Sequence, residues 1–176
     1  MIQGLTQVYC GTGKGKTTAA IGLGIRAIGN GMKVIMIQFL KNDDTGECKL
    51  LKQLEPNFKV FHFEKNRGFT WTLSEEEKKE LKQEIDMAVK FARKVMDTGE
   101  CDILILDEIL AAVQHGYVSL ETLTELVESR PEAMELVLTG RVLPEALKDK
   151  VDYISYIEAV KHPMEKGMEA RAGIEY

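Results

Sequence analysis

The chain has 176 residues, 44% of them hydrophobic and 29% charged, with a formal net charge of −5. This length and composition are typical of a single globular domain, here residues 1–176. The acidic balance, without a basic tract, argues against nucleic acid as the partner. The start of the chain lacks a signal-peptide pattern, and no apolar run reaches about 18 residues, so we expect a cytoplasmic protein without a membrane span.

Apolar segments with strand character alternate with amphipathic helical segments along the whole chain. Strands are expected at residues 5–10, 33–39, 60–63, 103–106, 135–138 and 152–157. Helices are expected at residues 17–28, 74–98 and 119–129, with a short one near 144–147. Continuous apolar strands between helices predict an α/β fold with a mostly parallel central sheet and helices on both faces.

The longest expected helix carries clear signals at both ends. Ser74 and Glu77 have the S-x-x-E spacing of a capping box, which satisfies two free backbone N–H groups at a helix start. Apolar residues then recur at spacings of four and three from Leu81 to Val95, which places them on one helical face. Gly99 is a natural end point.

The stretch VYCGTGKGKTTAA, from Val8 to Ala20, matches the end of the phosphate-binding pattern G-x-x-x-x-G-K-[ST], with Cys10 where the leading glycine belongs. Its glycines let backbone N–H groups surround an anion, and the following helix start favours phosphate. Lys16 adds a positive charge and the Thr17 hydroxyl can hold Mg²⁺. Although a glycine-rich turn with solvated lysines is the alternative, we expect a P-loop NTPase-like fold. The expected nucleotide-binding residues are Gly11, Thr12, Gly13, Lys14, Gly15, Lys16, Thr17 and Thr18.

The segment ILILDE resembles a Walker B strand, because four apolar residues deliver Asp107 and Glu108 to the carboxyl end of the sheet. With Thr17, these two carboxylates are the expected Mg²⁺ ligands. An exposed acidic turn at a helix start is the alternative. Glu108 could also activate a water, so the two motifs alone do not separate ATP hydrolysis from another use of ATP.

Beyond these motifs, the chain resembles the P-loop ATP:corrinoid adenosyltransferases, also called cob(I)alamin adenosyltransferases. The resemblance covers nearly the whole length and rests on the order and spacing of short motifs. They are GTGKGKTTAA at Gly11, IQFLK at Ile37, GFTW at Gly68, LDE at Leu106, LTGR at Leu138, VKHP at Val160 and ARAGIEY at Ala170. In this family the loop typically lacks the leading glycine too.

The resemblance implies that ATP and a corrinoid are the substrates and Mg²⁺ the cofactor. A reduced Co(I) corrinoid attacks the 5′ carbon of ATP and the triphosphate leaves, as part of adenosylcobalamin biosynthesis or salvage. The expected catalytic residues are Lys16, Glu108 and Arg141, although from the residues alone Arg141 could equally be a surface arginine. The resemblance assigns Phe69 and Trp71 to the corrinoid, whose lower axial ligand they help to remove; anchoring of their own loop is the alternative.

The resemblance further implies a homodimer and a separate reductase as electron donor. Longer family members carry a helical N-terminal extension, whereas nine residues precede Cys10 here. We therefore expect the reactive Co(I) to be shielded by the C-terminal ARAGIEY or by a partner subunit.

The remaining metal-binding residue types give no site. Cys10, Cys48 and Cys101 form no C-x-x-C pair, and His62, His115 and His162 lack metal-ligand spacing. His162 is expected to have a structural role beside Pro163. A generic P-loop ATPase or small-molecule kinase, and a non-catalytic corrinoid or nucleotide carrier, remain the alternative functions.

Overall fold

The computed structural model describes residues 3–41, 45–67 and 73–175. Its centre is a six-stranded sheet in the spatial order β3-β2-β4-β5-β1-β6. Every neighbouring pair is parallel. The strands are β1 (Thr6–Cys10), β2 (Val34–Gln38), β3 (Phe58–His62), β4 (Ile103–Asp107), β5 (Glu135–Gly140) and β6 (Tyr153–Tyr156). The predicted parallel α/β fold is confirmed.

Five α-helices and three short 3₁₀ segments accompany the strands in the described part of the chain. The α-helices are α1 (Lys16–Ile28), α2 (Gly46–Leu51), α3 (Glu75–Thr98), α4 (Ile109–Gln114) and α5 (Leu120–Glu128). The 3₁₀ segments are η1 (Lys52–Leu54), η3 (Glu145–Lys150) and η4 (Pro163–Lys166). None of the helices in the described ranges is long and apolar enough to cross a membrane.

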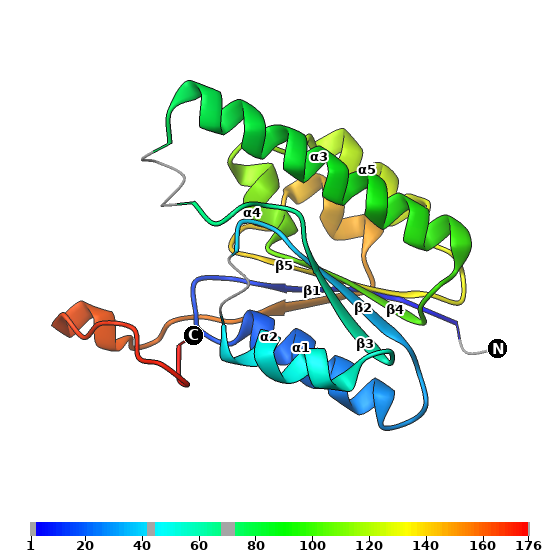
Figure 1. Cartoon of the computed structure of the whole chain (residues 1–176), viewed down its shortest axis with the longest axis horizontal. Helices are drawn as coiled ribbons and strands as arrows, with labels where there is room; N and C mark the ends of the chain where they lie inside the picture. Colours follow the sequence, from blue (N-terminus) through cyan, green and yellow to red (C-terminus); the bar gives the residue numbers. More distant parts are fainter. Residues whose placement is uncertain (1–2, 42–44, 68–72, 176) are drawn as a thin grey trace.

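The sheet lies between two helical layers, with α3 and α5 on one face and α1 and α2 on the other (Figure 1). Alternate residues of β1 to β5 supply the two cores, whereas the residues of the edge strand β6 are exposed. On the α3 side, Leu104 and Leu106 of β4 pack with residues such as Ile85 and Leu123. On the α1 side, Ile103 and Ile105 of the same strand belong to the second core. Burial on both faces explains why the strands are continuously apolar in sequence.

Helix α3 begins and ends as its sequence predicts. The Glu77 N–H donates to Ser74 Oγ at 3.2 Å, and the Ser74 N–H donates to Glu77 Oε2 at 2.8 Å, which completes the capping box. Gly99 ends the helix in the left-handed conformation, with φ of 63°.

The structure corrects the predicted elements at several places. Two short helices, α2 and α4, were not among the predicted elements. The third strand begins two residues earlier than predicted, at Phe58, and the short helix near 144–147 is the 3₁₀ segment η3. The other boundaries differ from the predicted ranges by one or two residues, which is the ordinary uncertainty of element ends.

Because all strands run the same way, their carboxyl ends meet at one edge of the sheet. At this edge Gln38 of β2 pairs with Asp107 of β4, and Cys10 of β1 lies between Gly140 of β5 and Tyr156 of β6. The predicted phosphate loop, acidic pair and Arg141 all follow these strand ends. The topology thus brings together motifs that are up to 130 residues apart in the chain (141 − 11).

Candidate active site

The loop from Gly11 to Gly15 joins β1 to α1 and can be built only with glycines at several positions. Gly11 and Gly15 have φ of 115° and 117°, a backbone region that L side chains rarely adopt. A Cβ on Gly13 would lie 2.8 Å from the carbonyl oxygen of Ile157. Conformation and close packing therefore both account for the G-x-G-x-G pattern.

Two backbone N–H groups of this loop are already hydrogen-bonded to carbonyl oxygens elsewhere in the chain. The Gly11 N–H donates to the Arg141 carbonyl oxygen at 2.9 Å, and the Gly13 N–H donates to the Ile157 carbonyl oxygen at 2.7 Å. An anion cradle would therefore consist of the N–H groups from Lys14 to Thr18. These include the first turn of α1, whose N–H groups have no partner within the helix.

Lys16 lies over the loop, where its Nζ donates to the Gly13 carbonyl oxygen at 2.8 Å. Burial lowers the pKa of Lys16, the carboxylate of Glu108 opposes this effect, and the charge of Arg141 adds to it. Lys16, Glu108 and Arg141, the three predicted catalytic residues, are thus close enough to influence one another electrostatically.

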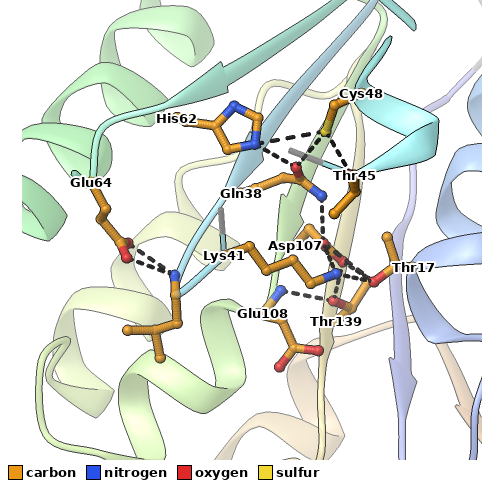
Figure 2. A network of polar contacts seen from close by, with 11 residues as sticks. Thr17, Gln38, Lys41, Thr45, Cys48, His62, Glu64, Asp107, Glu108 and Thr139 are labelled. Carbon is orange, nitrogen blue, oxygen red and sulfur yellow. Dashed lines mark hydrogen bonds and ion pairs between the residues drawn. The ribbon is translucent and has the colours of Figure 1, made fainter. Parts of the chain in front are cut away.

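Asp107, at the end of β4, is fully buried and is the centre of the polar network in Figure 2. Its Oδ1 accepts hydrogen bonds from Thr139 Oγ1 at 2.7 Å and from Thr17 Oγ1 at 3.0 Å. Its Oδ2 accepts from Gln38 Nε2 at 3.0 Å and from Lys41 Nζ at 2.7 Å. Two of the predicted Mg²⁺ ligands, Thr17 and Asp107, are therefore in direct contact.

Glu108 joins this network through its backbone. Its N–H donates to Thr139 Oγ1 at 2.8 Å, and its φ of 62° is unusual for a residue with a side chain. Burial raises the pKa of its carboxyl group, and the ammonium of Lys41 acts in the opposite direction. Such a carboxylate suits either a metal or a proton-transfer role.

The residue types at this site fit Mg²⁺. Mg²⁺ prefers oxygen ligands and usually combines one or two carboxylates with substrate phosphates and water. Thr17, Asp107 and Glu108 would supply such oxygens beside the phosphate loop. In the described ranges no three His, Cys, Asp or Glu side chains gather into a metal cage of their own. A metal held jointly with a nucleotide is therefore the arrangement that these residues suit.

A cavity of about 600 Å³ opens in front of the loop, a size typical of small-molecule sites. The predicted residues Gly13 to Thr18 and Glu108 line it, together with Lys41. Ile21 of α1, residues of α2 and residues of the C-terminal tail form the rest of its wall; those of α2 and the tail are Gly46, Glu47, Leu50, Gly173, Ile174 and Glu175.

The other predicted positions are more distant or lie outside the described residues. Arg141 is exposed just after β5, with its carbonyl oxygen on the phosphate loop. Phe69 and Trp71 lie outside the described residues, so their predicted corrinoid contact stays a prediction. His162 Nδ1 accepts the Met164 N–H at 3.2 Å and caps η4, as expected of a structural histidine.

Sequence reasoning missed four polar members of the site: Gln38, Lys41, His62 and Thr139. Gln38 binds Asp107 with one end of its amide, while its Oε1 contacts His62 Nε2 at 2.6 Å. The sequence signal that could have identified such a residue is a polar side chain at the end of an otherwise apolar strand, as with Gln38 in VIMIQ. Gln38, Lys41 and Thr139 also fall within the motifs IQFLK and LTGR, although no role was assigned to them.

A parallel α/β sheet, a glycine loop before α1 and a buried Asp at the end of β4 define a P-loop nucleotide-binding protein. Residues 2–176 also match the family model described as ATP:corrinoid adenosyltransferase BtuR/CobO/CobP. The chain belongs to this family, as its motifs predict.

Curated relatives agree with this assignment. The corrinoid adenosyltransferase of Escherichia coli K12 is 33% identical over 180 residues, covering 99% of this chain and 86% of the relative. Corrinoid adenosyltransferase CobA of Salmonella typhimurium is 34% identical, with the same two coverages. The corrinoid adenosyltransferase of Pseudomonas aeruginosa is 31% identical, over 99% of this chain and 84% of its own length.

Proposed function

We propose that the protein transfers the 5′-deoxyadenosyl group of ATP to the Co(I) centre of a reduced corrinoid and releases triphosphate, in adenosylcobalamin biosynthesis or salvage. The observation that carries this proposal is the family match across residues 2–176. The cavity in front of the phosphate loop supplies a nucleotide site of suitable size and charge.

In this reaction the electron pair of Co(I) forms the new cobalt–carbon bond. The bond between C5′ and the bridging oxygen breaks, and its electron pair leaves with the triphosphate. The nucleophile belongs to the corrinoid, so the protein needs no general base. Its task is to align cobalt with C5′, to exclude water and to stabilise the departing negative charge.

The residues of the cavity can perform that task. The N–H groups from Lys14 to Thr18 hold the triphosphate, and Lys16 and Arg141 offset its growing charge. Thr17, Asp107 and Glu108 hold Mg²⁺, which when bound neutralises charge on the phosphate oxygens. Phe69 and Trp71 meet the corrinoid and help to remove its lower axial ligand.

The setting proposed for the reaction follows the family. One domain, residues 1–176, acts as a homodimer in the cytoplasm, and a separate reductase supplies the Co(I) corrinoid. Exposed apolar residues on and after the edge strand β6, including Tyr153, Tyr156 and Val160, support an intersubunit contact there.

A generic P-loop ATPase or kinase is the second candidate, and one observation favours it. The raised pKa of Glu108 at the cavity wall is what a base for water or a hydroxyl would use. The two functions differ in their products, since hydrolysis or phosphoryl transfer gives ADP whereas adenosyl transfer gives triphosphate.

The test is an anaerobic assay with ATP, Mg²⁺ and a chemically reduced corrinoid. We expect adenosylated corrinoid, followed by its absorbance spectrum, and triphosphate in equal amounts. Lys16→Ala is the control, in which we expect both products to fall together by about 100-fold, as for the loss of one charged phosphate contact. Formation of ADP would favour the second candidate, and binding without turnover would point to a carrier.

A further inference from the structure

Lys41 lies where a divalent metal would be expected. Its Nζ is 2.5 Å from Thr17 Oγ1 and 2.7 Å from Asp107 Oδ2 (Figure 2). These two groups are the proposed metal ligands from the first turn of α1 and from β4. The side chain also lines the nucleotide cavity, so its ammonium is at once inside the polar network and beside the phosphate site.

The backbone before Lys41 is held in an uncommon conformation. Leu40 has φ of 54°, a value rarely adopted by residues with side chains. Its N–H is bound by both carboxylate oxygens of Glu64, at 2.9 and 3.0 Å. Glu64 lies just after β3, the strand next to β2. The segment that follows the neighbouring strand therefore directs the chain so that Lys41 turns back toward Asp107.

The ammonium also balances a charge that water cannot reach. Asp107 has no exposed surface, and three of its four donors, Thr17, Gln38 and Thr139, are neutral. A buried carboxylate without a counterion is strongly unfavourable. Among the residues that the structure describes, Lys41 is the cation within hydrogen-bond distance of Asp107, so it is the partner that stabilises the carboxylate.

Lys41 in this position and a bound metal exclude one another. Mg²⁺ binds its oxygen ligands at about 2.0–2.1 Å, so it would occupy the space between Thr17 Oγ1 and Asp107. An ammonium within hydrogen-bond distance of the same oxygens would lie close to the ion. Coulomb repulsion at such a distance is large in a partly buried site.

We propose that Lys41 is a resident counterion that holds the metal position until Mg²⁺ arrives together with nucleotide, and that its ammonium then turns to the triphosphate. The proposal rests on the Mg²⁺ site proposed above. It makes metal and nucleotide bind with positive coupling, because phosphate offers both an extra metal ligand and a new partner for the displaced ammonium. Mg²⁺ alone must compete with Lys41.

The decisive measurement is Mn²⁺ binding to the full chain without nucleotide, followed by the loss of the free-ion electron paramagnetic resonance signal. We expect weak binding to the wild type and at least about tenfold tighter binding to Lys41→Met. Lys33→Met is the control, since Lys33 is exposed just before β2, at the other end of that strand from Gln38 and Asp107, and this variant should bind Mn²⁺ as the wild type does.

The proposal would be overturned if Lys41→Met and the wild type bound Mn²⁺ with equal affinity. It would also be overturned if the wild type bound Mn²⁺ tightly in the absence of nucleotide. If Lys41→Met fails to fold, Lys41→Gln keeps a donor for Asp107 without the charge and should show the same gain. In the wild type, Mg²⁺ alone should leave the melting temperature unchanged, and an increase as large as that with Mg²⁺ and ATP would contradict the idea. None of these measurements involves a corrinoid, so a failure of the adenosyl-transfer proposal would be seen separately.

Discussion

Glu64, at the carboxyl edge of the sheet, is a carboxylic acid whose pKa depends mainly on its burial. Burial raises the pKa of Glu64 to about 7, and repulsion from Glu84 adds to this, while the Leu40 N–H and Arg67 act in the opposite direction. The group that fixes the turn before Lys41 therefore titrates close to neutral pH.

This shift predicts a pH-dependent stability. The folded pKa of Glu64 is above its usual value of 4.5, so the folded state binds more protons between about pH 4.5 and 7. The contribution to stability is complete below that range and is lost as pH rises through about 7. In Glu64→Gln, which keeps an acceptor for the Leu40 N–H, this loss should be absent. Between about pH 5 and pH 8 the variant should gain up to about 3 kcal/mol relative to wild type.

Urea unfolding of both proteins at the two pH values measures the difference. Parallel stability profiles for wild type and Glu64→Gln would contradict the assignment of a raised pKa to this residue.

Phe69 and Trp71 allow a second prediction at the scale of single residues. Replacing both with alanine should leave ATP affinity within about twofold, because neither belongs to the phosphate loop, but should suppress adenosylation at least about 100-fold. Isothermal titration with ATP and the anaerobic assay measure the two effects. Trp71→Phe keeps an aromatic ring and should retain most activity; full activity of the double alanine variant would remove the aromatic pair from the mechanism.

At the scale of elements, the phosphate loop is packed against the segment that follows β6. The Gly13 N–H is bound to the Ile157 carbonyl oxygen, and the Ile157 N–H is bound to the Cys10 carbonyl oxygen at 2.7 Å. The loop is therefore clamped from the end of the sheet. Its shape depends on the absence of a side chain at Gly13 as much as on glycine's flexibility.

Gly13→Ala should accordingly damage the loop. Its Cβ would lie 2.8 Å from backbone atoms of Ile157 and Glu158, so we expect a loss of about 1–3 kcal/mol and weaker ATP binding. Gly22→Ala is the matched control on α1, where an added Cβ meets nothing within 4 Å. This control should gain about 0.5–1 kcal/mol from helix propensity and keep its ATP affinity. Equal stability of the two variants in urea unfolding would show that the loop tolerates the side chain.

The long elements could be predicted from sequence, whereas the short helices could not. Helix α3 carries a capping box, a regular apolar face and a terminal Gly99, and its predicted span agrees with the structure. Helices α2 and α4 have six residues each. Helices of this length are marginal by themselves, so tertiary packing specifies them rather than a local pattern.

The candidate site was predictable where chemistry depends on consecutive residues. The phosphate loop and the Asp107–Glu108 pair are of this kind: the loop and Glu108 line the same cavity, and Asp107 is hydrogen-bonded to Thr17 of its wall. Gln38, Lys41 and Thr139 join the site through strand register and a turn at Leu40, which no local spacing encodes. Their roles follow only once neighbouring strands are aligned.

At the scale of the whole molecule, the C-terminal tail returns to the phosphate loop at the nucleotide cavity. Gly173, Ile174 and Glu175 of the tail line it together with the loop that follows β1. In Figure 1 the C-terminus lies at the edge of the sheet where that loop turns into α1. The tail carries little buried surface of its own, because the residues from 167 to 175 are exposed. Its position therefore points to a role in ligand binding rather than in folding.

Removing residues 169–176 tests this role. We expect the melting temperature without nucleotide to stay the same and ATP affinity to fall about tenfold, which corresponds to about 1.4 kcal/mol of lost contact. Thermal unfolding and isothermal titration measure the two quantities. If the truncated protein bound ATP with unchanged affinity, the tail would have no role in ATP binding. If it bound ATP more tightly, the Glu175 carboxylate would compete with phosphate.

The reactivity of the three buried cysteines can be used to measure local opening of the structure. Burial raises the pKa of each thiol, that of Cys101 to about 12, so alkylating reagents should react with them only when the surrounding structure opens. Cys48 lies in α2, part of the cavity wall, whereas Cys101 lies just before β4, at the other end of the strands. Labelling rates at these two thiols, read by mass spectrometry with and without ATP, would therefore separate closure of the nucleotide site from tightening of the whole fold, without adding any probe.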